Sequence, residues 1–294
     1  MPRRSPFTLL CQAMAKLAYP KLADLHAHTT ASDGDYTPSQ LVVHAHNANL
    51  KALAITDHDT TNGIAEAIAT AASFTSRTIE IIPGAEISTE HDGRDYHLLA
   101  YFINGDAPAL KSGLAASRDR RRVRFAEFLA TFERLNVSIP EHLTAPCRKV
   151  DISLGRRHLA GLLVAAGHVA THREAFQKFI LPNNAKTNHR SPLADAIQWV
   201  HAAGGVTSLA HPPSDFTFEN VKALADLGLD AVEANHPSTG YGFSEDLKSW
   251  AKSLNLLTTG GSDCHGPEPT RPVGCRTVSM DDLEALRRRA GRSG

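Results

Sequence analysis

The sequence lacks the features of several specialised classes of protein. Only four of its 294 residues are cysteine, with no CxxC pair and no regular spacing, which excludes a disulfide-stapled secreted domain and indicates a reducing compartment. No apolar run is long enough to span a bilayer. Neither sign of charge is in excess, because Lys plus Arg and Asp plus Glu each number 31, so no overall field attracts nucleic acid or an anionic membrane. We therefore expect a cytoplasmic protein that needs neither a membrane nor a stable protein partner.

The first 20 residues carry no convincing targeting signal. Arg3 and Arg4 precede a short apolar patch, but Gln12 and Lys16 interrupt that patch. A secretory signal peptide needs an apolar segment followed by a cleavage site, and no such site is evident. We expect residues 1–20 to be a disordered extension.

Short apolar runs alternate with helical patterns in residues 21–103 and again in residues 190–294, which is typical of an α/β fold. The expected strands are residues 22–25, 52–56, 79–82, 98–103, 206–210, 231–234 and 256–259. The expected helices are one that begins near Pro38 and residues 63–73, 192–203, 219–227 and 244–254. We expect these elements to form a parallel α/β barrel.

Residues 104–189 interrupt this alternation. Apolar residues recur there at helical spacing, among them Phe125, Phe128 and Phe132. We expect these aromatic side chains to form a core rather than a binding platform. The segment is therefore predicted to be a mostly helical insertion domain that lies over one end of the barrel.

Ionisable residues follow the expected strands, just past their carboxyl ends. They occur in six short motifs: Asp24 to His28, Asp57 to Asp59, Glu86, His211, Glu233 to His236, and Asp263 to His265. In a parallel barrel the carboxyl ends of the strands converge on one face, where active sites form. We therefore expect these chain-distant groups to meet in a single pocket.

The chemistry of this set is that of a metal centre, and the sequence has sixteen histidines to supply it. His26 and His28 lie two residues apart on an extended segment, so both imidazoles point to the same side. Mixed imidazole and carboxylate ligands suit divalent manganese, iron or zinc. A single histidine of this kind is as often structural, but burying so many unpaired ionisable groups would be costly without a metal to compensate them. The set as a whole predicts metal binding.

The order of these motifs resembles the PHP (polymerase and histidinol phosphatase) superfamily. The segments that carry the resemblance are DLHAHTTASDG, TDHD, PGAEIS, YHLLAYF, LAHP and GGSDCHG. The insertion, with GRRHLAGLLVAAGHV and AFQKFI, is similar to that of the stand-alone phosphoesterases that act on nucleoside 3′,5′-bisphosphates and short 5′-phosphorylated RNA. The resemblance implies a distorted (β/α)7 barrel that binds three divalent metal ions and hydrolyses a phosphate ester.

The resemblance also implies which residues hold the three ions. For the first ion the implied ligands are His26, His28, Glu86 and Asp263. Glu86 also bridges to the second ion, whose further implied ligands are His97 and His211. The implied ligands of the third ion are Asp33, His58 and His265. Every one of these positions holds a residue able to bind a metal, so we expect an active enzyme.

The expected reaction is direct hydrolysis by a metal-bound hydroxide, without a covalent phosphoenzyme. His236 or Asp59 could protonate the leaving oxygen, and the sequence does not choose between them; His236 could equally be structural.

Substrate phosphates far from the metals need cationic partners. The candidates are Arg156, Arg157 and His158, with His189 and Arg190 as weaker ones, because guanidinium groups bind phosphate in a bidentate manner. The alternative is a solvated helix start near Gly155. The basic run 118–124 could guide RNA, but we expect it to be the exposed face of an amphipathic helix.

Four functions remain open at this point. We favour a phosphatase acting on small nucleotides such as nucleoside 3′,5′-bisphosphates. A 5′-3′ exoribonuclease acting on short 5′-phosphorylated RNA uses the same chemistry and differs only in how far the pocket opens. A histidinol-phosphate-type phosphatase is disfavoured by the insertion, and a metal-binding scaffold by the complete ligand set.

Overall fold

The computed structural model describes residues 22–75, 77–149, 151–183 and 190–291. The expected N-terminal extension and the candidate His189 lie outside these residues. The strands are β1 (Leu22–Asp24), β2 (Ala52–Ile55), β3 (Glu80–His91), β4 (Arg94–Tyr101), β5 (Ser191–Pro192), β6 (Val206–Leu209), β7 (Ala231–Asn235), β8 (Leu257–Gly260) and β9 (Val278–Ser279).

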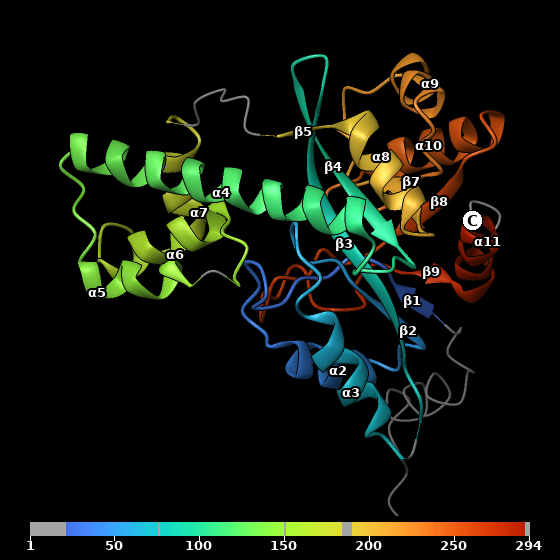
Figure 1. Cartoon of the computed structure of the whole chain (residues 1–294), viewed down its shortest axis with the longest axis horizontal. Coiled ribbons are helices and arrows are strands. Elements are labelled where there is room, and N and C mark those ends of the chain that lie inside the picture. Colours follow the sequence, from blue (N-terminus) through green and yellow to red (C-terminus); the bar gives the residue numbers. More distant parts are fainter. Residues whose placement is uncertain (1–21, 76, 150, 184–189, 292–294) are drawn as a thin grey trace, which may run out of the picture.

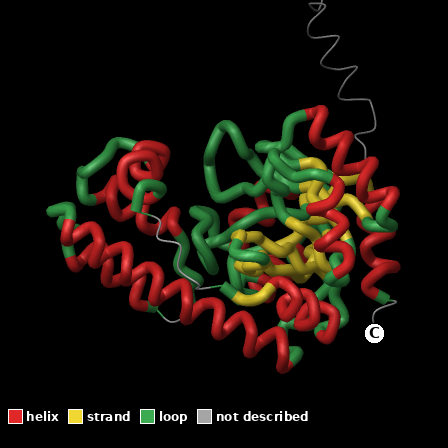
Figure 2. The backbone as a smooth tube through the Cα atoms, turned by 90° about the horizontal axis from the view of Figure 1, so that it is seen from above, coloured by secondary structure: helices red, strands yellow, loops and turns green. Residues whose placement is uncertain are grey.

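The strands form one curved sheet in the order β8-β7-β6-β4-β3-β2-β1-β9, with β5 paired to β3. The sheet nearly closes on itself, because the backbone beyond β1 meets the backbone beyond β8. The Leu25 N–H donates to the Gly260 carbonyl at 3.2 Å, and Ala27 forms a parallel bridge with Cys264. Figures 1 and 2 show the resulting barrel with helices around it. The predicted α/β barrel is confirmed.

One part of the barrel differs from the prediction: the sheet is mixed, not parallel. The strand expected over residues 79–82 continues to His91, and it forms a long antiparallel hairpin with β4, which also runs antiparallel to β6. The turn is made by Asp92 and Gly93, which have φ values of 50° and 71°. This Asp-Gly pair is the signature of a two-residue hairpin turn. The expected strand was ended at residue 82, before Pro83-Gly84, and this boundary was wrong because the strand continues through both residues.

Helices pack around the sheet. They are α2 (Pro38–Asn47), α3 (Ile64–Ala72), α8 (Leu193–Ala202), α9 (Phe218–Asp226), α10 (Tyr241–Ser253) and α11 (Met280–Ala290). The first of them begins where expected, because Pro38 occupies the first turn and the Thr37 side chain accepts the Gln40 N–H at 3.2 Å. The last helix, α11, was not predicted from the sequence.

The segment between β4 and β5 is mostly helical. It contains α4 (Pro108–Arg134), α5 (Glu141–Thr144), a 3-10 turn (Ala145–Arg148), α6 (Arg156–Ala165), α7 (His172–Ala175) and a π turn (Phe176–Ile180). The long helix α4 runs from the barrel out to the smaller helices (Figure 1). Its first half packs into the barrel core through Leu110 and Leu114, whereas Phe132 belongs to a separate core made only by residues 125–180. This separate core supports the predicted insertion domain, whose boundaries at residues 104 and 189 stay a prediction.

Phe132 tests how much this second core contributes to stability. Its side chain is fully buried and stacks edge-on near Phe179. Phe132→Ala is expected to lower the free energy of unfolding by about 3–5 kcal/mol, because it removes a large apolar side chain and leaves a cavity. Val123→Ala on the exposed side of the same helix should change it by less than about 0.5 kcal/mol. Urea unfolding followed by circular dichroism measures both, and equal effects would contradict a packed second core.

The basic run on α4 is not the exposed face that the sequence predicted. Its guanidinium groups reach neighbouring segments instead: Arg118 donates to the Asp59 carbonyl at 3.0 Å, and Arg120 donates to the Ser191 hydroxyl at 2.9 Å. Arg122 donates to the carbonyl of Ile152 at 3.2 Å. The periodicity of the sequence identified the helix but not the chain-distant carbonyls that it meets. Arg118 and Arg120 therefore fasten α4 to the barrel, and Arg122 fastens it to a later loop of the insertion. The contacts of these three arginines argue against their use as an RNA guide.

Candidate metal centre and substrate cavity

Nine predicted metal ligands lie close together at one end of the barrel. His26 and His28 follow β1, Asp33 lies in the next loop, and His58 follows β2. The other five come from the hairpin and from the loops after β6 and β8: Glu86, His97, His211, Asp263 and His265. The convergence expected at the carboxyl ends of the strands therefore occurs, although His97 reaches it from the middle of an antiparallel strand.

Glu86 stands at the centre of the cluster. One carboxylate oxygen is 3.1 Å from His28 Nε2 and 3.0 Å from His58 Nδ1, and the other is 2.7 Å from His97 Nδ1 and 3.1 Å from His211 Nε2. The side chain is only 1% exposed. Burial alone would raise the pKa of Glu86, but the surrounding histidines outweigh it and hold that pKa well below its ordinary value. Glu86 is therefore an ionised acceptor placed among imidazoles.

Asp263 gathers a second group of imidazoles. Its Oδ1 is 3.5 Å from His26 Nε2 and 3.4 Å from His28 Nε2, and its Oδ2 is 3.3 Å from His236 Nε2. Arg271 forms an ion pair with the same Oδ2. The backbone of Asp263 has a φ of 51°, a conformation that a residue with a side chain rarely adopts and that is concentrated at functional sites.

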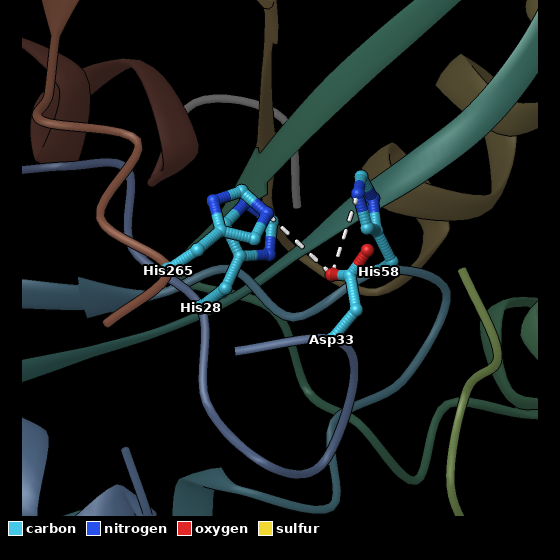
Figure 3. A group of neighbouring side chains, drawn as sticks. All are labelled: His28, Asp33, His58 and His265. Atoms are coloured by element: carbon cyan, nitrogen blue, oxygen red, sulfur yellow. Dashed lines mark ion pairs between the residues drawn. The ribbon is translucent and has the colours of Figure 1, made fainter. Parts of the chain in front are cut away.

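Asp33 serves the outer side of the cluster. Figure 3 shows its carboxylate pointing between the rings of His58 and His265, at 3.8 Å and 3.5 Å from their Nε2 atoms. His265 in turn stacks on His28, with ring centroids 4.1 Å apart. Burial alone would raise the pKa of Asp33, but the neighbouring histidines outweigh this effect and hold that pKa well below its ordinary value.

The cluster fits divalent metal ions. Several of its buried nitrogen and oxygen atoms have no hydrogen-bond partner among the described residues: His26 Nε2, both ring nitrogens of His28, Asp33 Oδ1, His58 Nδ1 and Glu86 Oε2. Buried polar atoms are almost always paired, so this many orphans in one place indicate ligands that face an ion. The ligand atoms form overlapping groups, and two assignments differ from the implied sets: His58 also groups with Glu86 and His97, and His236 groups with His26 and Asp263.

Three carboxylates of the strand-end motifs, to which the sequence assigned no role, support the ligand loops. Asp57 accepts from the Thr29 N–H and hydroxyl, both at 2.7 Å, and from the Ser32 hydroxyl at 2.6 Å, which shapes the loop that carries Asp33. Asp24 accepts from the backbone of Ser262 and Gly274, at 2.9 Å and 2.7 Å. Glu233 contacts two of the predicted ligands. Asp24 ends β1 and Asp57 follows β2, whereas Glu233 lies within β7. Their place in the motifs predicted that they join the cluster but not that they support its loops.

Asp59, a candidate proton donor, is engaged elsewhere. Its side chain is fully buried and forms an ion pair with Arg121, and it accepts the Ser88 N–H at 2.9 Å. Arg121 also donates to the Ser88 hydroxyl and the Leu154 carbonyl, at 2.6 Å and 3.2 Å. Asp59 thus links the barrel to α4.

A cavity of about 540 Å³ leads from the metal cluster into the insertion. Its lining includes His58, Asp263 and His265 of the metal cluster and Phe125, Phe128 and Phe176 of the insertion. Six arginines line the same cavity without belonging to the metal cluster: Arg121, Arg124, Arg156, Arg157, Arg190 and Arg271. Burial, together with repulsion from Arg190, Arg156 and Arg121, lowers the pKa of Arg124 to about 10. This crowding of cations suits an anionic ligand.

The predicted phosphate-binding residues differ in whether their side chains already pair with other residues of the protein. Arg156 forms no hydrogen bond or ion pair with any described residue, and it lines this cavity together with a second one. Arg157 is held by Asp35 and Glu268, and Arg190 is paired with Asp95. His158 accepts the Gly155 N–H through Nδ1 at 3.0 Å, so it caps the start of α6. Arg124 was not among the predicted residues.

A second cavity, of about 290 Å³, adjoins the first at the same cluster. The two cavities share His58, His97, Arg156, Asp263, His265 and Arg271, and the second adds a group of its own: Glu86, His211, His236 and Ser238. The metal cluster is therefore in contact with both spaces. Among the described helices, none is long and apolar enough to cross a lipid bilayer.

Comparisons with known proteins agree with this geometry. The PHP domain matches residues 24–205. The chain is 33% identical to the 5′-3′ exoribonuclease Rnm of Escherichia coli over 89% of this chain and 91% of that protein. It is 30% identical to the 3′,5′-nucleoside bisphosphate phosphatase of Chromobacterium violaceum, over 85% and 90%. A solved structure from Bifidobacterium adolescentis, named as a metal-dependent phosphoesterase, matches with a TM-score of 0.80 and 31% identity over 91% of this chain and 96% of that one.

Proposed function

Because this chain belongs to the PHP domain family and is a metal-dependent phosphoesterase, we propose that its substrate is a small nucleotide, such as a nucleoside 3′,5′-bisphosphate. The observation that carries the proposal is the 540 Å³ cavity, whose lining combines residues of the metal cluster, arginines and phenylalanines. This combination suits a phosphate at the metals, a second phosphate at the arginines and a base against the aromatic rings.

We propose that the cluster holds three divalent ions, manganese, iron or zinc, on the nine ligands described above. The orphaned buried atoms support this assignment, because each faces the interior of the cluster. When bound, such ions lower the pKa of water to supply a nucleophile and neutralise charge that develops on the phosphoryl oxygens.

His236 is the better placed of the two candidate proton donors. Its Nε2 lies 3.3 Å from Asp263 Oδ2, its Nδ1 lies 2.7 Å from the Ser238 hydroxyl, and it lines the second cavity. Both carboxylate oxygens of Asp59 are occupied by Ser88 and Arg121. We propose that His236 gives a proton to the leaving oxygen and that Asp59 holds Arg121 instead.

A 5′-3′ exoribonuclease is the second candidate, and the second cavity favours it. A phosphodiester has a nucleoside on each side of the reacting phosphorus, and here two adjoining cavities reach the metal cluster. Short RNA could place its terminal nucleotide in the larger cavity and the rest of the chain toward His236.

A phosphate-release assay decides between these substrates. The manganese-loaded protein is offered a nucleoside 3′,5′-bisphosphate, a 5′-phosphorylated oligoribonucleotide and histidinol phosphate, and mononucleotide release from the RNA is followed by chromatography. We expect the nucleoside 3′,5′-bisphosphate to react with the highest kcat/KM of the three substrates. Faster release of mononucleotides would replace it with the exoribonuclease, and reaction of histidinol phosphate alone would overturn both.

Arg156 tests the placement of the second phosphate. Arg156→Ala is expected to raise KM for the bisphosphate by about 10- to 100-fold with kcat changed only a few-fold, because it removes a charged hydrogen bond remote from the reacting phosphorus. Arg148→Ala, which affects an exposed arginine of the same insertion, is the control. An unchanged KM in Arg156→Ala would show that the phosphate binds elsewhere.

A further inference from the structure

We propose that Glu233 is a positioning residue that fixes ligands of two different metal ions relative to each other. The residue lies on β7 and its side chain is fully buried. It is outside the ligand sets given above, and the inference rests on the proposed assignment of His26 and His211 to the first and second ions.

The first contact orients His26. Glu233 Oε1 lies 2.9 Å from His26 Nδ1, while the opposite ring nitrogen, Nε2, points at Glu86 and Asp263, at 3.4 Å and 3.5 Å. A carboxylate at Nδ1 favours the tautomer with the proton on that nitrogen, which leaves the lone pair of Nε2 for a metal. His26 Nε2 is one of the buried atoms without a hydrogen-bond partner, as expected for a ligand.

The second contact fixes His211 through its backbone. Glu233 Oε2 accepts the His211 N–H at 2.6 Å. His211 has a φ of 31°, which is unfavourable for a residue with a side chain, so it needs such support to persist. Its Nε2 lies 3.1 Å from Glu86 Oε1, whereas His26 Nε2 lies nearest the other oxygen, Oε2.

Each oxygen of Glu233 is therefore occupied by a different ligand residue, one after β1 and one after β6. The carboxylate is fully buried. Glu233 thus orients ligands and does not itself reach an ion, and it couples the first ion to the second. The third set (Asp33, His58 and His265) has no contact with it among the described residues.

Asp230, next to the start of the same strand, provides a matched control. It directly precedes β7, is 6% exposed, and its Oδ2 lies 2.8 Å from His201 Nε2 and accepts the Thr207 N–H at 3.0 Å. It thus makes the same kind of carboxylate contact to an imidazole and a backbone N–H, but away from the metal cluster.

The test measures manganese binding rather than activity. Glu233→Gln supplies one acceptor oxygen, whereas the His26 ring N–H and the His211 backbone N–H each need an acceptor. Equilibrium dialysis with elemental analysis is therefore expected to show a roughly 10- to 100-fold weaker manganese affinity at two sites together, as for other residues that orient ligands. The third site should keep its affinity. Asp230→Asn should bind manganese as the wild type does, and the thermal unfolding of both metal-free variants shows whether each is folded.

Wild-type binding at all sites in Glu233→Gln would overturn the proposal. So would an equal loss at all three sites, or the same loss in Asp230→Asn, because both would indicate general destabilisation. If the wild type bound three ions but released phosphate from no nucleotide, the proposed substrate would be wrong and the role of Glu233 would stand.

Discussion

Asp263→Asn is expected to reduce phosphate release by about a thousandfold or more, because metal ions contribute several kcal/mol to phosphoryl transfer and this carboxylate meets several ligands. The side chain faces His26, His28 and His265 through one oxygen and His236 through the other. An amide has the same shape but no charge, and it supplies one acceptor where the carboxylate supplies two. The variant should therefore keep its fold and lose metal.

Two measurements on the same preparation check this. Elemental analysis should show fewer ions per chain, and phosphate release should fall with the metal content. Asp215→Asn is the control, because that carboxylate is 66% exposed and pairs with Arg94 away from the cluster. Full activity in Asp263→Asn would remove Asp263 from the metal centre and with it the proposed first ion.

Gly155→Ala should have the next largest effect, about a hundredfold loss of activity from a single methyl group. Gly155 caps α6 in an extended conformation that alanine also adopts, with φ −130° and ψ 172°. A Cβ there would overlap Asp33 Oδ2 and lie 2.9 Å from its Cγ. The carboxylate must turn away or α6 must retreat, and displacement of a reacting group by about 1 Å can cost a hundredfold in rate.

Gly161→Ala isolates this effect, because it makes the same change within the same helix. A Cβ at Gly161 would have an ordinary contact of 3.6 Å with His172 Nε2. Replacing a glycine inside a helix by alanine should stabilise the fold slightly. Gly155→Ala is expected to lose manganese from the third site while Gly161→Ala does not. Equal kinetics in the two variants would show that α6 does not constrain Asp33.

The clustering of the proposed metal ligands was predictable because most of them lie at recognisable positions in the sequence. His26, His58 and Asp263 each follow a short apolar strand, and the strand ends of a barrel must converge. His97 was not marked in this way: it lies within β4, and only the resemblance to a family pointed to it. The Asp92-Gly93 turn was visible in the sequence, and it would have given the hairpin that brings His97 to Glu86.

The side-chain partners of cations could not be predicted, because they are distant in the chain. Nothing local to α4 shows that Arg121 meets Asp59, 62 residues away, and nothing near Arg157 shows that Glu268 occupies it. The same holds for Glu233 and His26, which are separated by 207 residues. Hydrophobic periodicity determines which face of a helix is buried, but the pairing of polar groups depends on the assembled fold.

The insertion contacts the loop that carries Asp33, so metal binding at Asp33 and docking of the insertion should each strengthen the other. The Ser153 N–H donates to the Ala31 carbonyl at 3.1 Å, Arg157 donates to the Asp33 carbonyl at 3.3 Å, and Gly155 lies against the Asp33 side chain. By thermodynamic linkage, an ion that holds Asp33 in place also strengthens the docking of α6, and a docked α6 tightens the hold on the ion. Protease resistance of residues 135–183 should therefore report metal occupancy, and loss of metal should expose first the wall of the cavity that receives the substrate.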